Sequence, residues 1–259
     1  SIAQKLRRSG FEVIVNDRQD SKGLRAATTR FADRLRQGAG VDRAIVVASG
    51  HFASALRAPW LLGVEARDVD SLGIGAYGLP VNGLTGLLAG YQGQAAIVLG
   101  EDKQNLLLGR GVSAGTQGMS FPHGVSGFIA PANRLDKIVT SLLTPGLPLA
   151  EIAKTAGPGI QARGYLPRTA AFLPQVGQLV SPEGSYWDAL RDLGTEEALQ
   201  FYLKRYPNGR HAAEARAALR DLRDDETIKQ KRQENQLNLT RAQRRDVQRD
   251  LTLLGYNTR

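Results

Sequence analysis

The sequence predicts an α/β fold, a mainly parallel sheet flanked by helices, with a small all-α region at the C-terminal end. Two observations lead to this prediction. Short apolar runs rich in branched residues recur along the first part of the chain, and such runs are typical of parallel strands buried on both faces. Segments whose apolar residues recur at helical spacing separate these runs, and this alternation is typical of α/β layers.

The first part of the chain alternates between the two kinds of segment. Ile2 and Leu6 lie one helical turn apart, and Leu24, Phe31 and Leu35 continue the helical spacing in a longer stretch. We predict helices over residues 2–9, 22–37 and 79–88, and strands over residues 11–15, 44–48 and 95–99. Between these elements we expect loops over residues 52–78 and over the Gly- and Ser-rich residues 103–127.

A segment rich in Pro and Gly separates the α/β domain from the C-terminal part. We place the domain at residues 1–175 and the linker at 176–184, with a helical hairpin or repeat at 185–222 and a polar linker and final helix at 223–259. Within these bounds we predict a strand over 125–130 and helices over 134–143, 149–156, 186–193, 196–206, 211–222 and 241–253.

The composition excludes several classes of function. The chain has no cysteine, which excludes disulfides, cysteine-ligated zinc, iron–sulfur clusters and a thiol nucleophile. It carries 34 basic and 25 acidic residues, and the net charge of +9 is either a solvated surface or a face for an anionic partner such as cell-wall glycan. No nucleic-acid-binding motif accompanies the charge, and no apolar run is long enough to span a membrane.

The candidate site lies where two predicted parallel strands end. Ser49-Gly50-His51 follows the strand over 44–48, and Gly100-Glu101-Asp102 follows the strand over 95–99. Because ligand sites in such sheets lie at the carboxyl ends of the strands, we expect His51 and the two carboxylates on one edge. Glu101 and Asp102 are either an acid/base pair or solvated loop carboxylates. No metal-ligand spacing accompanies them, so we expect no metal and no cofactor.

These residues carry a resemblance to caspase-like cysteine peptidases. Ser49-Gly50-His51 after an apolar strand resembles the family's Ser-Gly-His-Gly motif, and Val98–Lys103 takes the place of its Leu-Asp-Ala-Cys-Arg stretch. Residues 9–13 look like the family's Gly-Phe-x-Val strand, and residues 60–65 resemble its Tyr-Leu-x-Pro-x-Asp stretch. The resemblance covers residues 1–175 and implies the caspase-like fold, with His51 at the position of the general base.

The chain departs from this family where its chemistry is decided. Asp102 stands at the position of the nucleophilic cysteine, which the peptidase mechanism requires as a thiolate; a register shifted by one residue would put Glu101 there instead. Phe52 replaces the glycine after the histidine and is expected to place a bulky ring where the substrate carbonyl should approach. Gly100 replaces an aspartate that shapes the pocket for a basic side chain in bacterial members. Catalysis by the family's ordinary route is therefore excluded.

The C-terminal part carries two further resemblances. Residues 206–210, within the predicted hairpin, are similar to a helical repeat that follows caspase-like domains in bacterial proteins. Residues 239–257 resemble the first helix and turn of a peptidoglycan-binding module, and the alternative is a basic amphipathic helix. These resemblances imply a bacterial protein of the periplasm or cell envelope, with the cytoplasm as the alternative.

Together these observations lead to two functional hypotheses. In the first, the chain is an inactive caspase-like domain that binds a peptide or protein, and possible binding to peptidoglycan comes from its C-terminal segment. Gly50, Phe52, Gly100 and Glu101 would then contribute to the binding site, with His51 as a vestigial base and Asp102 at the lost nucleophile position. In the alternative, the chain is a hydrolase in which His51 and a substituted nucleophile act on another substrate.

Overall fold

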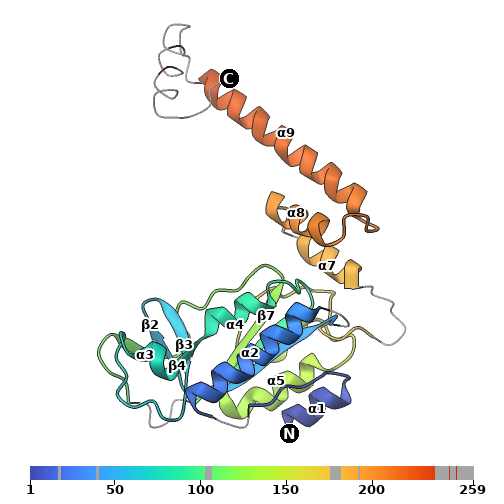
Figure 1. Ribbon diagram of the computed structural model, residues 1–259. Coiled ribbons are helices and arrows are strands. Elements are labelled where there is room, and N and C mark those ends of the chain that lie inside the picture. The colour runs from blue at the N-terminus through green and yellow to red at the C-terminus, as the bar shows by residue number, and fades with distance from the viewer. Residues whose placement is uncertain are drawn as a thin grey trace. The chain divides into compact units, whose positions relative to one another are not determined.

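The computed structural model of this protein describes residues 1–16, 19–38, 41–102, 107–175, 182–191 and 193–236, together with Arg245 and Arg249. The chain divides into two compact units, Ser1–Gly194 and Thr195–Arg259. The first unit holds the strands and the helices that flank them (Figure 1), and the described part of the second unit contains helices and no strand. The α/β class predicted from the sequence is confirmed.

The central sheet of the first unit is mainly parallel. Its strand order is β1-β5-β7-β8; the first three strands are parallel to one another, and β8 runs antiparallel to β7. The bounds are β1 (Ala44–Gly50), β5 (Ala95–Glu101), β7 (Val125–Pro131) and β8 (Gln161–Gly164). The strands predicted over 44–48, 95–99 and 125–130 are thus confirmed, whereas β8 was not predicted because Gln161–Gly164 carries no apolar pattern.

Helices cover both faces of this sheet, which explains why its strands are apolar without alternation. On one face, Ile97 and Leu99 of β5 pack with apolar residues of α2 and α4. On the other face, Ala96 and Val98 pack with residues of α1, α5 and α6. These helices are α1 (Ile2–Arg8), α2 (Ser21–Gln37), α4 (Val81–Leu88), α5 (Leu135–Leu142), which follows a short 3₁₀ turn η1 (Ala132–Arg134), and α6 (Leu149–Thr155).

A second, antiparallel sheet forms mostly where the sequence predicted loops, and its strand Gly78–Pro80 also takes the first two residues of the helix predicted over 79–88. It has the strand order β4-β3-β2-β6, and its bounds are β2 (Phe52–Ala55), β3 (Ala58–Leu62), β4 (Gly78–Pro80) and β6 (Val112–Ala114), with the one-turn helix α3 (Ile74–Tyr77) before β4. The loop prediction for 52–78 and for this part of 103–127 is therefore wrong. These strands are three to five residues long, and nine of their fifteen residues are Ala, Ser, Pro or Gly, so the β-forming signal that reveals longer strands is weak.

The strand predicted over residues 11–15 is also wrong. This segment has no ladder partner among the described residues, and the Phe11 N–H donates to the Leu6 carbonyl at 3.1 Å, as part of the exit from α1. A strand requires a neighbour that accepts its backbone hydrogen bonds, so an apolar alternation is not sufficient. Phe11 and Val13 still bury part of their side chains against the core on the α5 face.

The C-terminal helices differ from the prediction mainly in their extent. Helix α7 (Pro182–Arg191) belongs to the first unit, while α8 (Glu196–Arg205) and α9 (Ala212–Gln236) belong to the second, so the division falls inside the predicted hairpin region of 185–222. Helix α9 continues to Gln236 through residues predicted as polar linker or exposed helix. Apart from Arg245 and Arg249, the segment that resembles a peptidoglycan-binding module lies outside the described residues. No helix among the described residues is long and apolar enough to cross a membrane.

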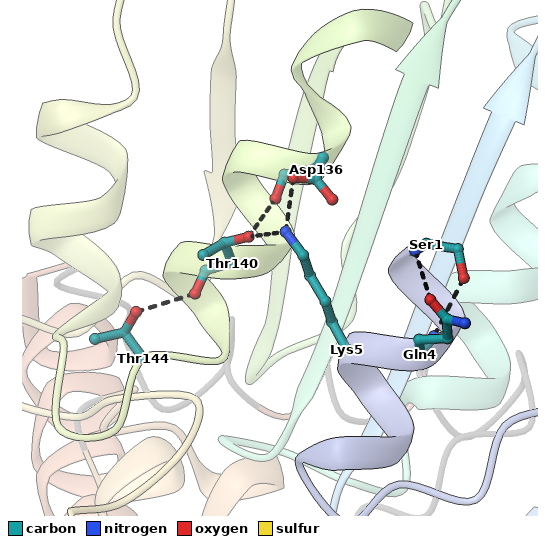
Figure 2. A network of polar contacts seen from close by, with 6 residues as sticks. All are labelled: Ser1, Gln4, Lys5, Asp136, Thr140 and Thr144. Atoms are coloured by element: carbon teal, nitrogen blue, oxygen red, sulfur yellow. Dashed lines mark hydrogen bonds and ion pairs between the residues drawn. The ribbon is translucent and has the colours of Figure 1, made fainter.

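Helix α1 is held to α5 by one buried side chain and one polar network. Leu6 is 7% exposed and packs into the core formed with α5. Figure 2 shows the network beside it, in which the Lys5 ammonium donates to Asp136 Oδ2 at 2.7 Å and to Thr140 Oγ1 at 2.8 Å. Because both partners of this ion pair are partly exposed, solvent screening leaves it with a small contribution to stability.

A carboxylate from the loop after β3 joins the N-cap residue Asp20 at the amino-terminal end of α2. Glu65 Oε1 accepts a hydrogen bond from the Ser21 N–H at 2.8 Å, at the end of the helix where negative charge is favourable. Partial desolvation raises the pKa of Glu65, but hydrogen bonds from the Ser21 hydroxyl and N–H and from its own backbone N–H outweigh this effect, and the pKa lies below its ordinary value of 4.5. Within residues 60–65, whose pattern suggested the family stretch, this glutamate therefore fastens the loop to α2.

We expect Leu6→Ala to cost about 2 kcal/mol of unfolding free energy and Lys5→Ala less than about 1 kcal/mol. The reason is that the leucine leaves a cavity in the core, whereas the lysine loses only a screened ion pair. Urea unfolding followed by the fluorescence of Trp60 and Trp187, which both lie in the first unit, measures the two values. An equal loss of unfolding free energy in the two variants would contradict the conclusion that the buried leucine contributes more than the ion pair.

We expect Glu65→Gln to lower stability by roughly 0.5 kcal/mol near neutral pH, because the amide loses the charge at the helix end. Since the folded-state pKa of Glu65 lies below the unfolded value, the charge stabilises the folded state fully above the unfolded pKa of about 4.5, and this stabilisation disappears as the pH falls through the folded pKa. The wild-type and Glu65→Gln stability curves should therefore converge at acid pH. A difference that grows on acidification would exclude this role.

Candidate functional site

Pairing between β1 and β5 brings the two predicted site segments together. Ser49 pairs with Gly100 and Gly50 with Glu101 in the parallel ladder, and the Asp102 N–H then donates to the Gly50 carbonyl at 2.8 Å. His51 follows directly, and its carbonyl accepts the Leu62 N–H at 2.9 Å, which joins the end of β1 to the β2–β3 hairpin. His51, Glu101 and Asp102 therefore lie at one edge of the sheet, as predicted.

The His51 ring is positioned by a main-chain oxygen and not by a carboxylate. Its Nδ1 lies 2.9 Å from the Asp102 carbonyl oxygen. A carbonyl only accepts hydrogen bonds, so in this contact Nδ1 carries the proton and the neutral ring keeps its lone pair at Nε2. The half-buried imidazole is thereby fixed with a hydrogen-bond acceptor at Nε2.

The two carboxylates next to His51 have different surroundings. Glu101 is half-buried, and its Oε1 accepts a hydrogen bond from Thr116 Oγ1 at 3.1 Å, whereas Asp102 is exposed. Thr116 belongs to a loop that is also fastened through the Gly115 N–H, which donates to the Phe52 carbonyl at 2.8 Å. Sequence reasoning missed Thr116, because no motif marks it and only the pairing of β6 with β2 brings it here.

The two glycines of the site have packing roles. Gly50 has a φ of +154°, and a Cβ placed there would lie 3.2 Å from Leu61 Cδ1. A Cβ on Gly100 would overlap Leu135 Cδ1 and lie 3.1 Å from Ala132 Cα. The Cβ direction of Gly100 thus points toward η1 and α5, away from the face of β5 on which the Glu101 side chain lies. An aspartate would have no room at this position.

Phe52 does not lie where the sequence suggested. Its side chain is 2% exposed and belongs to the core cluster that includes Leu61, Leu79 and Leu99. The expectation that its ring stands where a substrate carbonyl should approach is therefore wrong: Phe52 is the first residue of β2, and its ring packs into the core. The approach to His51 is not blocked by this ring.

The remaining candidates do not form a cluster with His51. Among the described residues, no three His, Asp or Glu side chains gather in a group that could hold a metal ion. His123 lies exposed in a turn before β7. The positioned groups at this edge are the His51 imidazole, the Asp102 backbone and the Glu101–Thr116 pair. They offer hydrogen-bond acceptors and negative charge.

We expect Gly100→Ala to destabilise the first unit by about 1–3 kcal/mol, because the added methyl group overlaps Leu135. The double variant Gly100→Ala with Leu135→Ala should lose less stability than the sum of the losses of the two single variants. The reason is that the smaller side chain at position 135 leaves space for the added methyl group. Gly86→Ala in α4 is the matched control: a Cβ there meets nothing within 4 Å, and alanine favours the helix. Urea unfolding of Gly100→Ala, Leu135→Ala, the double variant and Gly86→Ala measures these losses, and full additivity would contradict the overlap.

In comparisons with known proteins, no family model and no curated protein matches this chain. The resemblance to caspase-like peptidases therefore rests on the motifs named above and on the order of the elements around them. What this edge of the sheet does follows from the chemistry of its residues.

Proposed function

We propose that this protein is a catalytically inactive caspase-like domain that binds a peptide or protein segment at the edge of the sheet formed by His51 and Asp102. The observation that carries the proposal is the contact between His51 Nδ1 and the backbone carbonyl of Asp102, at the ends of two adjacent parallel strands. A histidine held in this way next to a thiol would be a general base for it. The chain has no cysteine, and the neighbouring side chain is a carboxylate.

Hydrogen bonding remains available to such a site after the loss of its nucleophile. The Nε2 atom of the neutral His51 ring accepts a hydrogen bond from a donor such as a peptide N–H. Glu101 and Asp102 add negative charge on the same edge. These groups support recognition of an extended peptide, whose backbone offers a donor at each residue other than proline.

A hydrolase with a substituted nucleophile is the competing function. Its mechanism would require His51 to exchange a proton with the attacking group or with water. In the described geometry the protonated Nδ1 is directed at a main-chain carbonyl, and the Glu101 carboxylate is hydrogen-bonded to Thr116. The Nε2 atom is still able to accept a proton, but the chain has no cysteine and neither of these contacts supplies another activated nucleophile, so we place binding above hydrolysis.

Association with the cell envelope is part of the same proposal. It rests on the resemblance of residues 239–257 to the start of a peptidoglycan-binding module and on the net charge of +9. Co-sedimentation of the protein with purified peptidoglycan is the measurement for this part. Release by salt alone would favour a simple charge interaction.

We expect no cleavage of fluorogenic peptides with basic, acidic or neutral residues before the scissile bond, by either the wild type or His51→Ala. Binding of a peptide from the same panel should weaken about fivefold in His51→Ala, since one hydrogen bond is lost. His123→Ala removes an exposed histidine from a turn and should leave binding unchanged. Turnover that disappears in His51→Ala would establish the hydrolase instead.

A further inference from the structure

Strand β6 forms an open edge of the second sheet. In the order β4-β3-β2-β6, its ladder partner is β2, and the described residues give it none on the other side. Such an edge presents unpaired backbone donors and acceptors, which a further strand can use. Ser113 and Ala114 are exposed, so this edge is accessible.

The ladder register identifies the groups that face outward. The Gly115 N–H donates to the Phe52 carbonyl, which makes these two residues a hydrogen-bonded pair of the antiparallel ladder. Hydrogen-bonded and non-hydrogen-bonded pairs alternate along such a ladder. The backbone N–H and carbonyl of Ser113 therefore point toward Ser54, and the backbone groups of Val112 and Ala114 point away from β2. The Ala114 carbonyl accepts a hydrogen bond from Gln117 Nε2 at 2.9 Å. The Val112 N–H and carbonyl and the Ala114 N–H have no such partner among the described residues.

A hollow lies beside this edge at the turn between β2 and β3. Its volume is about 420 Å³. Its lining includes Leu56 and Arg57 of the turn, Ser113 of β6 and Gln117. Leu56 is 76% exposed at the tip of the turn, although a solvent-facing leucine contributes nothing to the core. The hollow and the edge together offer space for side chains next to free backbone groups.

The turn beside the hollow is strained. Leu56 and Arg57 have φ angles of +53° and +63°, and they form the two central positions of a tight hairpin turn, where Asn-Gly is favoured. Gly118 lies against the Arg57 carbonyl so closely that a Cβ there would overlap it. Backbone strain of this kind persists only where surrounding structure holds it, and it is concentrated at ligand sites.

Two unpaired arginines give this end of the edge a positive charge. Arg57 lies in the turn that follows Ala55. Val112 pairs with Ala55, and Arg110 precedes Val112 by two residues, so Arg110 lies at the same end of the edge. Both are exposed, and neither guanidinium makes an ion pair or hydrogen bond with a described residue. The charge at the β6 edge is therefore left for a partner.

We propose that an extended acidic peptide of a partner protein adds to β6 as a further strand, with a carboxylate side chain directed at Arg57 and Arg110. The inference rests on the proposed function, because it names the partner of a peptide-binding domain and the edge that receives it. The edge begins at the Arg57 turn and ends at Gly115, whose contact with Phe52 lies next to His51. A bound strand displaces the Gln117 side chain and takes its hydrogen bond to the Ala114 carbonyl.

Fluorescence anisotropy of the full chain with three labelled peptides tests this inference. The peptides share an alternating Thr-Val sequence and carry two Glu, two Gln or two Lys residues. We expect the Glu peptide to bind about tenfold more tightly than the Gln peptide, with a difference that salt reduces, and the Lys peptide to bind least. Arg57→Gln with Arg110→Gln should abolish this preference, whereas Arg163→Gln on β8 should keep it.

Two variants of the edge complete the test. Ala114→Pro removes an outward N–H and leaves the β2 ladder intact, so binding of the Glu peptide should fall about tenfold while the urea midpoint stays close to that of the wild type. Gln117→Ala frees the Ala114 carbonyl and should strengthen binding about threefold, a gain that misfolding cannot produce. If peptides bind, but Ala114→Pro and Gln117→Ala have no effect, the inference is overturned and the proposed function remains. Absence of all peptide binding overturns both.

Discussion

The parallel pairing of β1 with β5 is the interaction on which the rest of the structure depends. It aligns Gly50 with Glu101 and is extended by the hydrogen bond from the Asp102 N–H to the Gly50 carbonyl. Both strands are apolar because helices cover both faces, so hydrophobic burial fixes the register and the register fixes the site. A shift of one residue would exchange the faces of β5 and separate the His51 ring from the carbonyl that orients it.

The sequence predicted the parts of the fold whose signal is local. The strands at 44–48 and 95–99 and the helix α2 follow from apolar runs and helical spacing, which one segment carries by itself. The second sheet could not be found in this way, because Leu56 and Arg57 form the turn of its hairpin, and neither residue type is favoured in such a turn. Residues 11–15 show the opposite failure, in which a strand-like pattern has no partner to pair with.

The same limit applies to the site. That His51 and Asp102 share an edge could be predicted, because strand ends of parallel neighbours meet. The directions of Phe52 and Gly100 could not, because each depends on a ladder or a helix contact formed by distant residues. Phe52 enters the core through β2, and Gly100 makes room for Leu135. A motif comparison assigns such residues to a pocket by position alone, and here that assignment does not hold for Phe52.

A carboxylate, and not a thiol, follows the strand end beside His51, and this limits the chemistry of this edge of the sheet. The contact that orients His51 comes from the Asp102 main chain, so it does not depend on the side chain at this position. A charged carboxylate accepts hydrogen bonds and attracts cations, but it lacks the nucleophilic reactivity of a thiolate. This edge therefore holds a positioned imidazole without a thiol for covalent chemistry, and reversible binding, the function we propose, is consistent with both the observed geometry and the absence of cysteine from the sequence.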